Sequence, residues 1–340
     1  MGKIVSGITH WGSIALALVA FAANGPSSSQ VNRIPAIRSS INGPTALALD
    51  NNEHLYVIEG EEDRVQPIDL SDGTISVVAG YGRKQGKDCA HQDGIQATNA
   101  CLHYPVSLTV DASGNLFIGE IGGYVRKVDV GSGLISTVVG SGHSGETTEG
   151  SSARSANFWA IDGLAIDAGN NFFILDSGQG VIFKVDGKTG IVTRVAGNRE
   201  QGDRGDGESA LRATFRFAGA ISLDKADNLL IADYGNCRVR RVEQSTGIVR
   251  TVAVTGEVNQ NGSCKAGNLD PGPYPSDAVA DSAGNVYFVE GAMDIVRRVD
   301  ARTLRLSTVV GTGAKGFDGD GGPAVLSKLN NPSGLAIDRD

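Results

Sequence analysis

Two neighbouring stretches decide the fold: Leu164-Ala165-Ile166-Asp167 and Phe172-Phe173-Ile174-Leu175-Asp176. Each is a short apolar run that ends in an acid, and the polar residues 168–171 lie between them. Short apolar runs bounded by turn residues are typical of β-strands. The two stretches therefore predict a pair of antiparallel strands joined by a tight turn.

The same phrase recurs along the chain of 340 residues. The aspartates that close its first run are separated by 61, 56, 57, 57 and 57 residues, which is typical of a tandem repeat whose units stack on one another. The sixth copy begins at residue 335, and the sequence ends two residues after its aspartate. We call these residues the anchor aspartates: Asp50, Asp111, Asp167, Asp224, Asp281 and Asp338.

Each complete copy holds two further strand signals. A run in which basic and apolar residues alternate, as at 238–243, precedes a turn and a β-branched run, as at 191–197 in the copy before. Four strands joined by tight turns form an antiparallel meander that cannot bury both of its own faces. Neighbouring meanders must therefore stack, and closing the stack into a ring protects its edges. The sequence predicts an all-β protein, a β-propeller of four-stranded antiparallel blades whose units start near residues 45, 106, 162, 219, 276 and 333.

The clearest copy of the repeat ends in Phe317-Asp318-Gly319-Asp320-Gly321-Gly322-Pro323-Ala324 and Leu329-Asn330-Asn331-Pro332-Ser333-Gly334. From about residue 34 onward the chain resembles the NHL-repeat propellers, especially the long-linker type of secreted and bacterial proteins. The linker at 254–275 departs most from that pattern. The resemblance implies a six-bladed parent, so we expect five complete blades, the first strand of a sixth, and a C-terminally incomplete chain. A rival interpretation is a five-bladed propeller closed by the N-terminal apolar run.

The first 22 residues are expected to be a signal peptide, which leaves 23–340 as the propeller. Lys3 precedes an unbroken apolar run at 14–23, and Ala20-Phe21-Ala22 supplies a small-x-small cleavage pattern. The run has the length of a signal-peptide core and is too short to span a bilayer. The alternative is that residues 14–21 form a strand of the domain. We therefore expect a secreted, extracytoplasmic protein with no membrane span.

Composition narrows the classes of partner. A hydrophobic content of 40% excludes a disordered chain, because it is enough to build a core. The net charge of -8 argues against nucleic acid as a partner, since phosphate backbones are bound by basic surfaces. The ligand class that remains is protein or carbohydrate.

The four cysteines suit two disulfides in an oxidising compartment. Strand alternation places the linkers between blades and the loops between second and third strands on one face. Cys89 and Cys101 share the first linker, while Cys237 lies in such a loop and Cys264 in the linker that leaves the same blade. This geometry predicts the pairs Cys89–Cys101 and Cys237–Cys264. The alternative is a set of unpaired thiols or a metal site.

Two repeated sets of charges are candidates for chemistry. An acid ends every second strand, and a basic residue follows in every third strand. A residue that every blade supplies is better explained as a cross-strand partner that stabilises the blade than as a catalyst. The acids are Glu59, Glu120, Asp176, Asp233 and Glu290, and the basic residues are Arg64, Arg126, Lys184, Arg238 and Arg297.

The linkers supply the remaining candidates. Acid–glycine pairs at 93–94, 149–150, 206–207 and 320–321 suggest calcium loops, but none has the full EF-hand spacing, so we expect each acid to cap a short helical turn. His91, His103 and His143 lie in linkers on one face and form a candidate zinc site, although two adjacent linkers supply all three. No catalytic residue and no cofactor is predicted; calcium and zinc are the alternatives.

These observations predict a secreted propeller that acts as a protein- or glycan-binding or scaffold module through its linker face. The alternative is a metal-dependent propeller enzyme of the lyase or lactonase type, with its site over the ring axis. Propellers of both kinds exist, so the fold alone does not decide between them.

Overall fold

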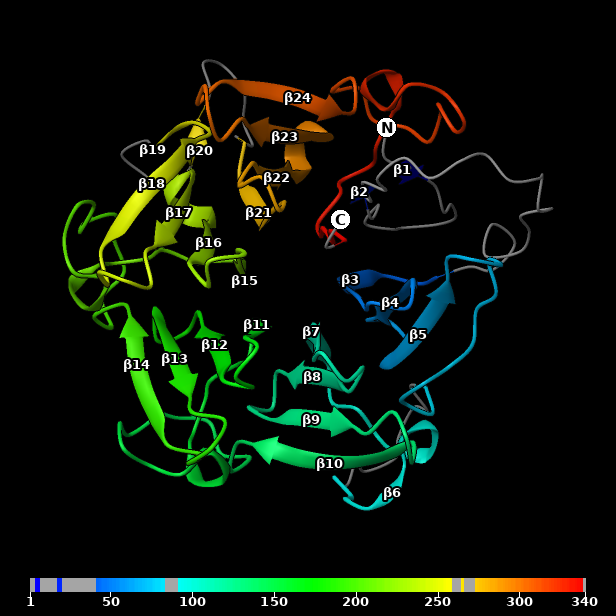
Figure 1. The fold of residues 1–340 in the computed structure, drawn as a ribbon, viewed down its shortest axis with the longest axis vertical. Coiled ribbons are helices and arrows are strands. Elements are labelled where there is room, and N and C mark those ends of the chain that lie inside the picture. The colour runs from blue at the N-terminus through cyan, green and yellow to red at the C-terminus, as the bar shows by residue number, and fades with distance from the viewer. Residues whose placement is uncertain are drawn as a thin grey trace.

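The structure, a computed structural model, describes residues 4–6, 17–19, 41–82, 91–258, 264–265 and 273–338. Five antiparallel sheets stand around a central space, and the first strand of each lies nearest the centre (Figure 1). The prediction of an all-β propeller with antiparallel blades is confirmed, with five blades. Blade one consists of β3 (Pro44–Leu49), β4 (His54–Glu59) and β5 (Arg64–Asp69). Blade two consists of β7 (Pro105–Val110), β8 (Leu116–Glu120), β9 (Val125–Val128) and β10 (Leu134–Val139), and the short strand β6 (Ile95–Gln96) pairs with β10 at the edge of the sheet. Blade three is β11 (Gly163–Ile166), β12 (Phe172–Asp176), β13 (Val181–Val185) and β14 (Val192–Ala196); blade four is β15 (Ala220–Leu223), β16 (Leu229–Asp233), β17 (Arg238–Val242) and β18 (Val249–Val254); blade five is β21 (Pro275–Ala280), β22 (Val286–Glu290), β23 (Ile295–Val299) and β24 (Leu306–Val310).

Blade one is the least regular blade. Its fourth strand is reduced to two antiparallel bridges, Val65 with Ala79 and Ile68 with Ile75. Two small two-stranded sheets complete the strands: β1 (Ile4–Ser6) with β2 (Ala17–Val19), and β19 (Glu257–Val258) with β20 (Cys264–Lys265). Among the described residues, no helix is long and apolar enough to cross a membrane.

The first strand of a sixth blade is not confirmed. Residues 332–338 form no strand, because within the described part of the chain no second strand pairs with them. They run instead toward the ring centre beside β21, where the Leu335 amide donates a hydrogen bond of 2.8 Å to Asp277 Oδ2 (Figure 1).

In each of the five blades the anchor aspartate organises the turn that follows the first strand. Asp111 Oδ1 accepts the amides of Ser113 (2.9 Å) and Asn115 (2.8 Å), and its Oδ2 accepts the Asn115 side-chain amide at 2.8 Å. The Asn115 side-chain oxygen accepts the Val130 amide, which ties this turn to the next hairpin. Blades three, four and five repeat the arrangement, whereas blade one has His54 at the asparagine position.

The core consists of separate apolar clusters between neighbouring blades. Blades one and two share a cluster that contains Ile58 and Ile118, and blades three and four share one that contains Leu175 and Ile231. Single blades therefore bury their faces only against neighbours, as the sequence predicts. The C-terminal segment fills the place between blades five and one, since Leu335 joins the cluster of blade five and Ala336 that of blade one.

Candidate functional site: the linker face and the axial cavity

In four of the five blades, the acid at the end of the second strand tethers the linker that enters its own blade. The backbone amide eight residues before the anchor aspartate donates to this carboxylate in four blades, which makes the acid structural. All five acids are buried. The donors are Asn42 to Glu59 (2.8 Å), His103 to Glu120 (3.2 Å), Trp159 to Asp176 (2.9 Å) and Arg216 to Asp233 (3.0 Å).

Blade five breaks this pattern. The equivalent position is Pro273, which has no N–H, and Glu290 Oε1 is a buried oxygen without a hydrogen-bond partner. Burial raises the pKa of Glu290, and the positive charge of Arg297 offsets part of this rise. Burial also raises the pKa of Asp233 to about 6, although Asn236, the Arg216 amide and two arginines favour its charged form.

The predicted cross-strand charge pairs form in two blades only. Glu59 binds Arg64, and Glu290 lies 3.6 Å from Arg297. The prediction is wrong for Arg126 and Lys184, whose side chains contact another acid or a ring. Arg238 lies opposite Asp233 in the strand register and favours the charged form of that carboxylate, but it forms its ion pair with another acid. Arg126 binds Asp93 at 3.4 Å, Arg238 lies 3.7 Å from Asp203, and Lys184 lies over the Phe173 ring. Asp233 instead lies 3.6 Å from Arg240.

The linker acids bind the outer strands of the blades that follow them. Asp93 accepts the amide and hydroxyl of Thr137, and Asp206 accepts the Thr251 amide and buried Arg240. These contacts lower the pKa of both aspartates against the effect of burial. The predicted short turns exist as 3₁₀ helices. The prediction that the linker acids cap them is wrong, because residues other than these acids occupy the N-cap positions and no side chain forms a capping hydrogen bond there. The turns are η2 (Ala97–Asn99), η3 (Ala153–Ser155), η4 (Ala210–Arg212) and η7 (Ala324–Leu326).

The structure brings two of the three predicted histidines together. The rings of His91 and His103 lie 6.0 Å apart, and His91 Nε2 lies 2.8 Å from buried Glu120. The His91 ring also packs on Tyr124 at 4.3 Å. His143 is exposed, with Nδ1 3.4 Å from the Ser141 hydroxyl. In the part of the chain that the structure describes, no three His, Cys, Asp or Glu side chains are arranged to hold a metal ion.

A disulfide joins blade four to the linker that follows it. Cys237 and Cys264 are bonded, with their Cα atoms 5.4 Å apart. Cys89 lies outside the described residues, so its pairing with Cys101 stays a prediction.

An arc of aromatic side chains on the linker face is absent from the sequence-based predictions. Tyr104, Trp159 and Phe217 stand just before the first strands of blades two, three and four, with 49%, 52% and 65% of their surface exposed. At the start of blade five, Tyr274 stacks on Tyr234 with ring centroids 4.5 Å apart. We call these five residues the aromatic arc. Alignment of the copies on the anchor aspartates is the signal that finds it, because four of the rings lie seven or eight residues before an anchor.

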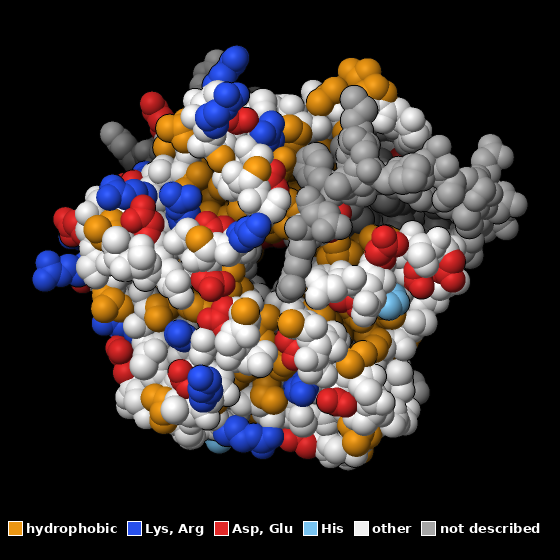
Figure 2. Space-filling model, in the orientation of Figure 1, with side chains coloured by type: hydrophobic (Ala, Val, Ile, Leu, Met, Phe, Trp, Pro, Cys, Tyr) orange, Lys and Arg blue, Asp and Glu red, His pale blue; other side chains and the backbone are white. Residues whose placement is uncertain are grey.

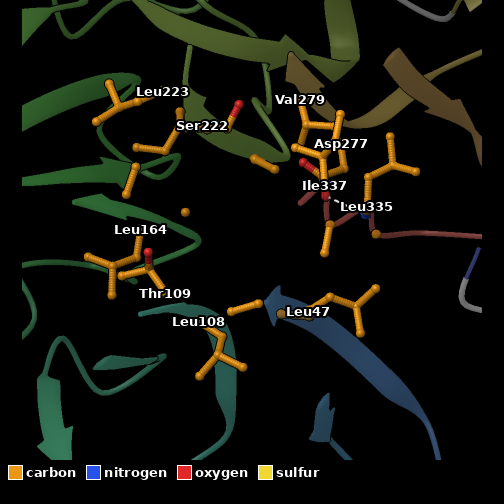
Figure 3. A pocket seen from close by; sticks show the side chains of 18 of the residues that line it. Leu47, Leu108, Thr109, Leu164, Ser222, Leu223, Asp277, Val279, Leu335 and Ile337 are labelled. Atoms are coloured by element: carbon orange, nitrogen blue, oxygen red, sulfur yellow. Dashed lines mark hydrogen bonds between the residues drawn. The ribbon is translucent and has the colours of Figure 1, made fainter. Parts of the chain in front are cut away.

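The ring axis holds a cavity of about 580 Å³. Side chains from β3, β7, β11, β15, β21 and the C-terminal segment surround it (Figure 3), and Figure 2 shows the opening at the ring centre with charged side chains around it. The lining residues that the structure describes include seven aspartates and one lysine: Asp162, Asp167, Asp224, Asp227, Asp277, Asp281, Asp338 and Lys225.

Asp277 is the unusual member of this lining. The other blades carry Ala46, Ser107, Gly163 and Ala220 at its position, four residues before the anchor. Its carboxylate accepts the amides of Ala278 and Leu335, both at 2.8 Å. Burial nevertheless raises its pKa to about 6, so the charged form is disfavoured here.

Comparison with known proteins supports the fold assignment. Protein SUPPRESSOR OF QUENCHING 1, chloroplastic, from Arabidopsis thaliana is 23% identical over 327 residues, and human NHL repeat-containing protein 2 is 25% identical over 269 residues. The alignments cover 92% and 71% of this chain but only 30% and 36% of those proteins. Among solved structures, a protein of unknown function from Bacteroides thetaiotaomicron aligns with a TM-score of 0.60 and 16% identity, over 89% of this chain and 66% of that one.

The family match is more specific than these likenesses. Residues 84–265, more than half of the chain, match the Teneurin NHL domain. Human Teneurin-4 itself is 33% identical over 106 residues, which are 27% of this chain and 4% of that protein. The chain therefore belongs to the NHL-repeat β-propellers of the Teneurin NHL domain family.

Proposed function

We propose that this propeller is a binding module that recognises a protein partner through its linker face. The observation that carries the proposal is the aromatic arc, which places exposed rings at the starts of consecutive blades. Tyrosine, tryptophan and arginine are the residues that dominate the binding energy of protein interfaces. Arg204, whose side chain is 80% exposed, lies in the linker that precedes Phe217.

The backbone supports the same proposal. Tyr104 and Phe217 have φ angles of 48° and 45°, in the left-handed region that bulky residues rarely occupy. Gly43 and Asn331 hold the equivalent positions beside blade one and in the C-terminal segment, and both tolerate this conformation. Large rings on strained backbone with about half or more of their surface in water contribute little to folding, so we assign them to binding.

We further propose that the protein is secreted, with residues 1–22 as its signal peptide. The Cys237–Cys264 disulfide supports an oxidising compartment. We also propose that residues 333–338 take the place of the innermost strand of a sixth blade. Their apolar contacts with blades five and one and the repeat phrase that they carry support this placement.

The test is binding to two arrays, one of purified secreted and cell-surface protein domains and one of purified glycans. We expect a protein ligand that binds the double variant Tyr104→Asn/Phe217→Asn at least about tenfold more weakly than the wild type. Leu304→Asn is the matched control. Like the two aromatic residues, Leu304 is exposed (77%) and has a positive φ (57°), but it lies in a turn on the face opposite the linkers. Equal binding by all three proteins, or recognition of glycans alone, would contradict the proposal.

A further inference from the structure

The axial cavity carries an inference that is independent of the linker face. Six partly exposed aliphatic side chains line it, one from the last residue of each inner strand and one from the C-terminal segment. Each is the residue immediately before an anchor aspartate, so the repeat places all six at one level of the axis. We call them the aliphatic collar: Leu49, Val110, Ile166, Leu223, Ala280 and Ile337.

Carboxylates lie on both sides of this collar. On the side of the linkers, Asp162 directly precedes β11 and Asp277 is the third residue of β21. On the opposite side, Asp167, Asp224, Asp227 and Asp281 follow the inner strands. Asp281 lies four positions after Asp277, which corresponds to about 14 Å of extended strand. The cavity therefore presents negative charge at two levels with an apolar band between them.

The charge of the lining selects a cation. Seven aspartates against one lysine give a strongly negative wall, and a cavity with low-dielectric walls concentrates such a field. Asp277 is held by two backbone amides, and among the described residues no cationic side chain pairs with it. A half-buried carboxylate without a counter-ion gains more from a bound cation than a fully exposed one does, because less water competes for it.

We propose that the axial cavity binds a linear aliphatic polyamine, with one ammonium group at Asp277, the methylene chain inside the aliphatic collar and a second ammonium group among the aspartates beyond it. A compact metal cation would leave the collar unused, and a monoamine would leave one acidic end unpaired. A cavity of about 580 Å³ lies within the usual range for small-molecule sites.

Isothermal titration with spermidine at about 150 mM salt tests the proposal, because screening at this ionic strength suppresses binding to exposed charges. We expect one site per chain. Asp277→Asn should weaken binding at least about tenfold, and Asp203→Asn, which removes the same charge from an exposed linker, should not. Hexylammonium, which has the chain but one charge, should bind at least about tenfold more weakly than spermidine.

A second variant tests the path through the collar without any change of charge. Ala280 is the smallest collar residue, and Ala280→Leu introduces the side chain that blades one and four already carry there. We expect this variant to fold with an unchanged melting temperature and to lose spermidine binding, whereas Tyr104→Asn/Phe217→Asn should retain it. Spermidine binding that survives Asp277→Asn and Ala280→Leu, or that Mg²⁺ displaces at equal concentration, would overturn the proposal.

Discussion

Asp277 shows how a single residue departs from a repeat. Alanine, serine or glycine suffices at this position in the other blades, where the inner strand only needs to fit against its neighbours. A carboxylate here lies in the cavity wall with a pKa raised to about 6 by burial. Groups with such shifts beside a cavity are candidates for function, because an ionised carboxylate there is kept at a cost to stability.

Asp277 also predicts how stability depends on pH. Its folded pKa of about 6 lies above its ordinary value of 3.8, so its favourable contribution is complete below pH 3.8 and is lost as the pH rises through 6. Asp277→Asn should therefore gain stability relative to the wild type between pH 4 and pH 8, by about 1–3 kcal/mol.

Urea denaturation at a series of pH values measures this difference. Asp203→Asn serves as the control, since it removes one carboxylate from an exposed linker. If the free energy of unfolding of the wild type instead increased relative to that of Asp277→Asn as the pH rises, the fold would favour the charged carboxylate and the prediction would be wrong.

At the scale of elements, the tether from second strand to linker explains why four of the five blades keep their acid. Four buried carboxylates accept an amide of the incoming linker, and in the fifth blade Pro273 holds the donor position and has no N–H. A hydrogen bond to a charged group contributes about 1.5–3 kcal/mol, and the loss of proline's restriction of the unfolded chain costs about 0.4–1 kcal/mol. Pro273→Ala should therefore stabilise the protein by about 1 kcal/mol.

A double-mutant cycle with Glu290→Gln isolates this effect in chemical denaturation. We expect most of the gain from Pro273→Ala to disappear in the Glu290→Gln background. An equal gain in both backgrounds would mean that the new amide does not reach Glu290.

The sequence predicts the elements better than it predicts their side-chain partners. Spacing of the anchor aspartates locates all five blades, and the presence of an acid in every copy identifies that acid as structural. Arg126 and Lys184 are misassigned because a side chain's partner depends on the path of the linker and on the face to which strand register directs it. The aromatic arc is not predicted from the strand patterns, because its members lie outside the strands. Their common position becomes visible only when whole copies of the repeat are aligned.

At the scale of the whole molecule, the residues that stabilise the ring differ from those that we assign to binding. Apolar clusters between blades hold the ring together, whereas the aromatic arc stands outside them on the linker face. A side chain kept for binding on an unfavourable backbone can be replaced without loss of stability. This distinction makes the central claim of a binding face testable without knowledge of the partner.

The most direct measurement is the free energy of unfolding of Tyr104→Asn/Phe217→Asn. Left-handed backbone costs a bulky residue about 1–2 kcal/mol, and asparagine tolerates it, so we predict that the double variant is about 1 kcal/mol more stable than the wild type. A loss of more than about 1 kcal/mol, which is typical of a destabilising substitution, would contradict the account and assign the two rings to folding.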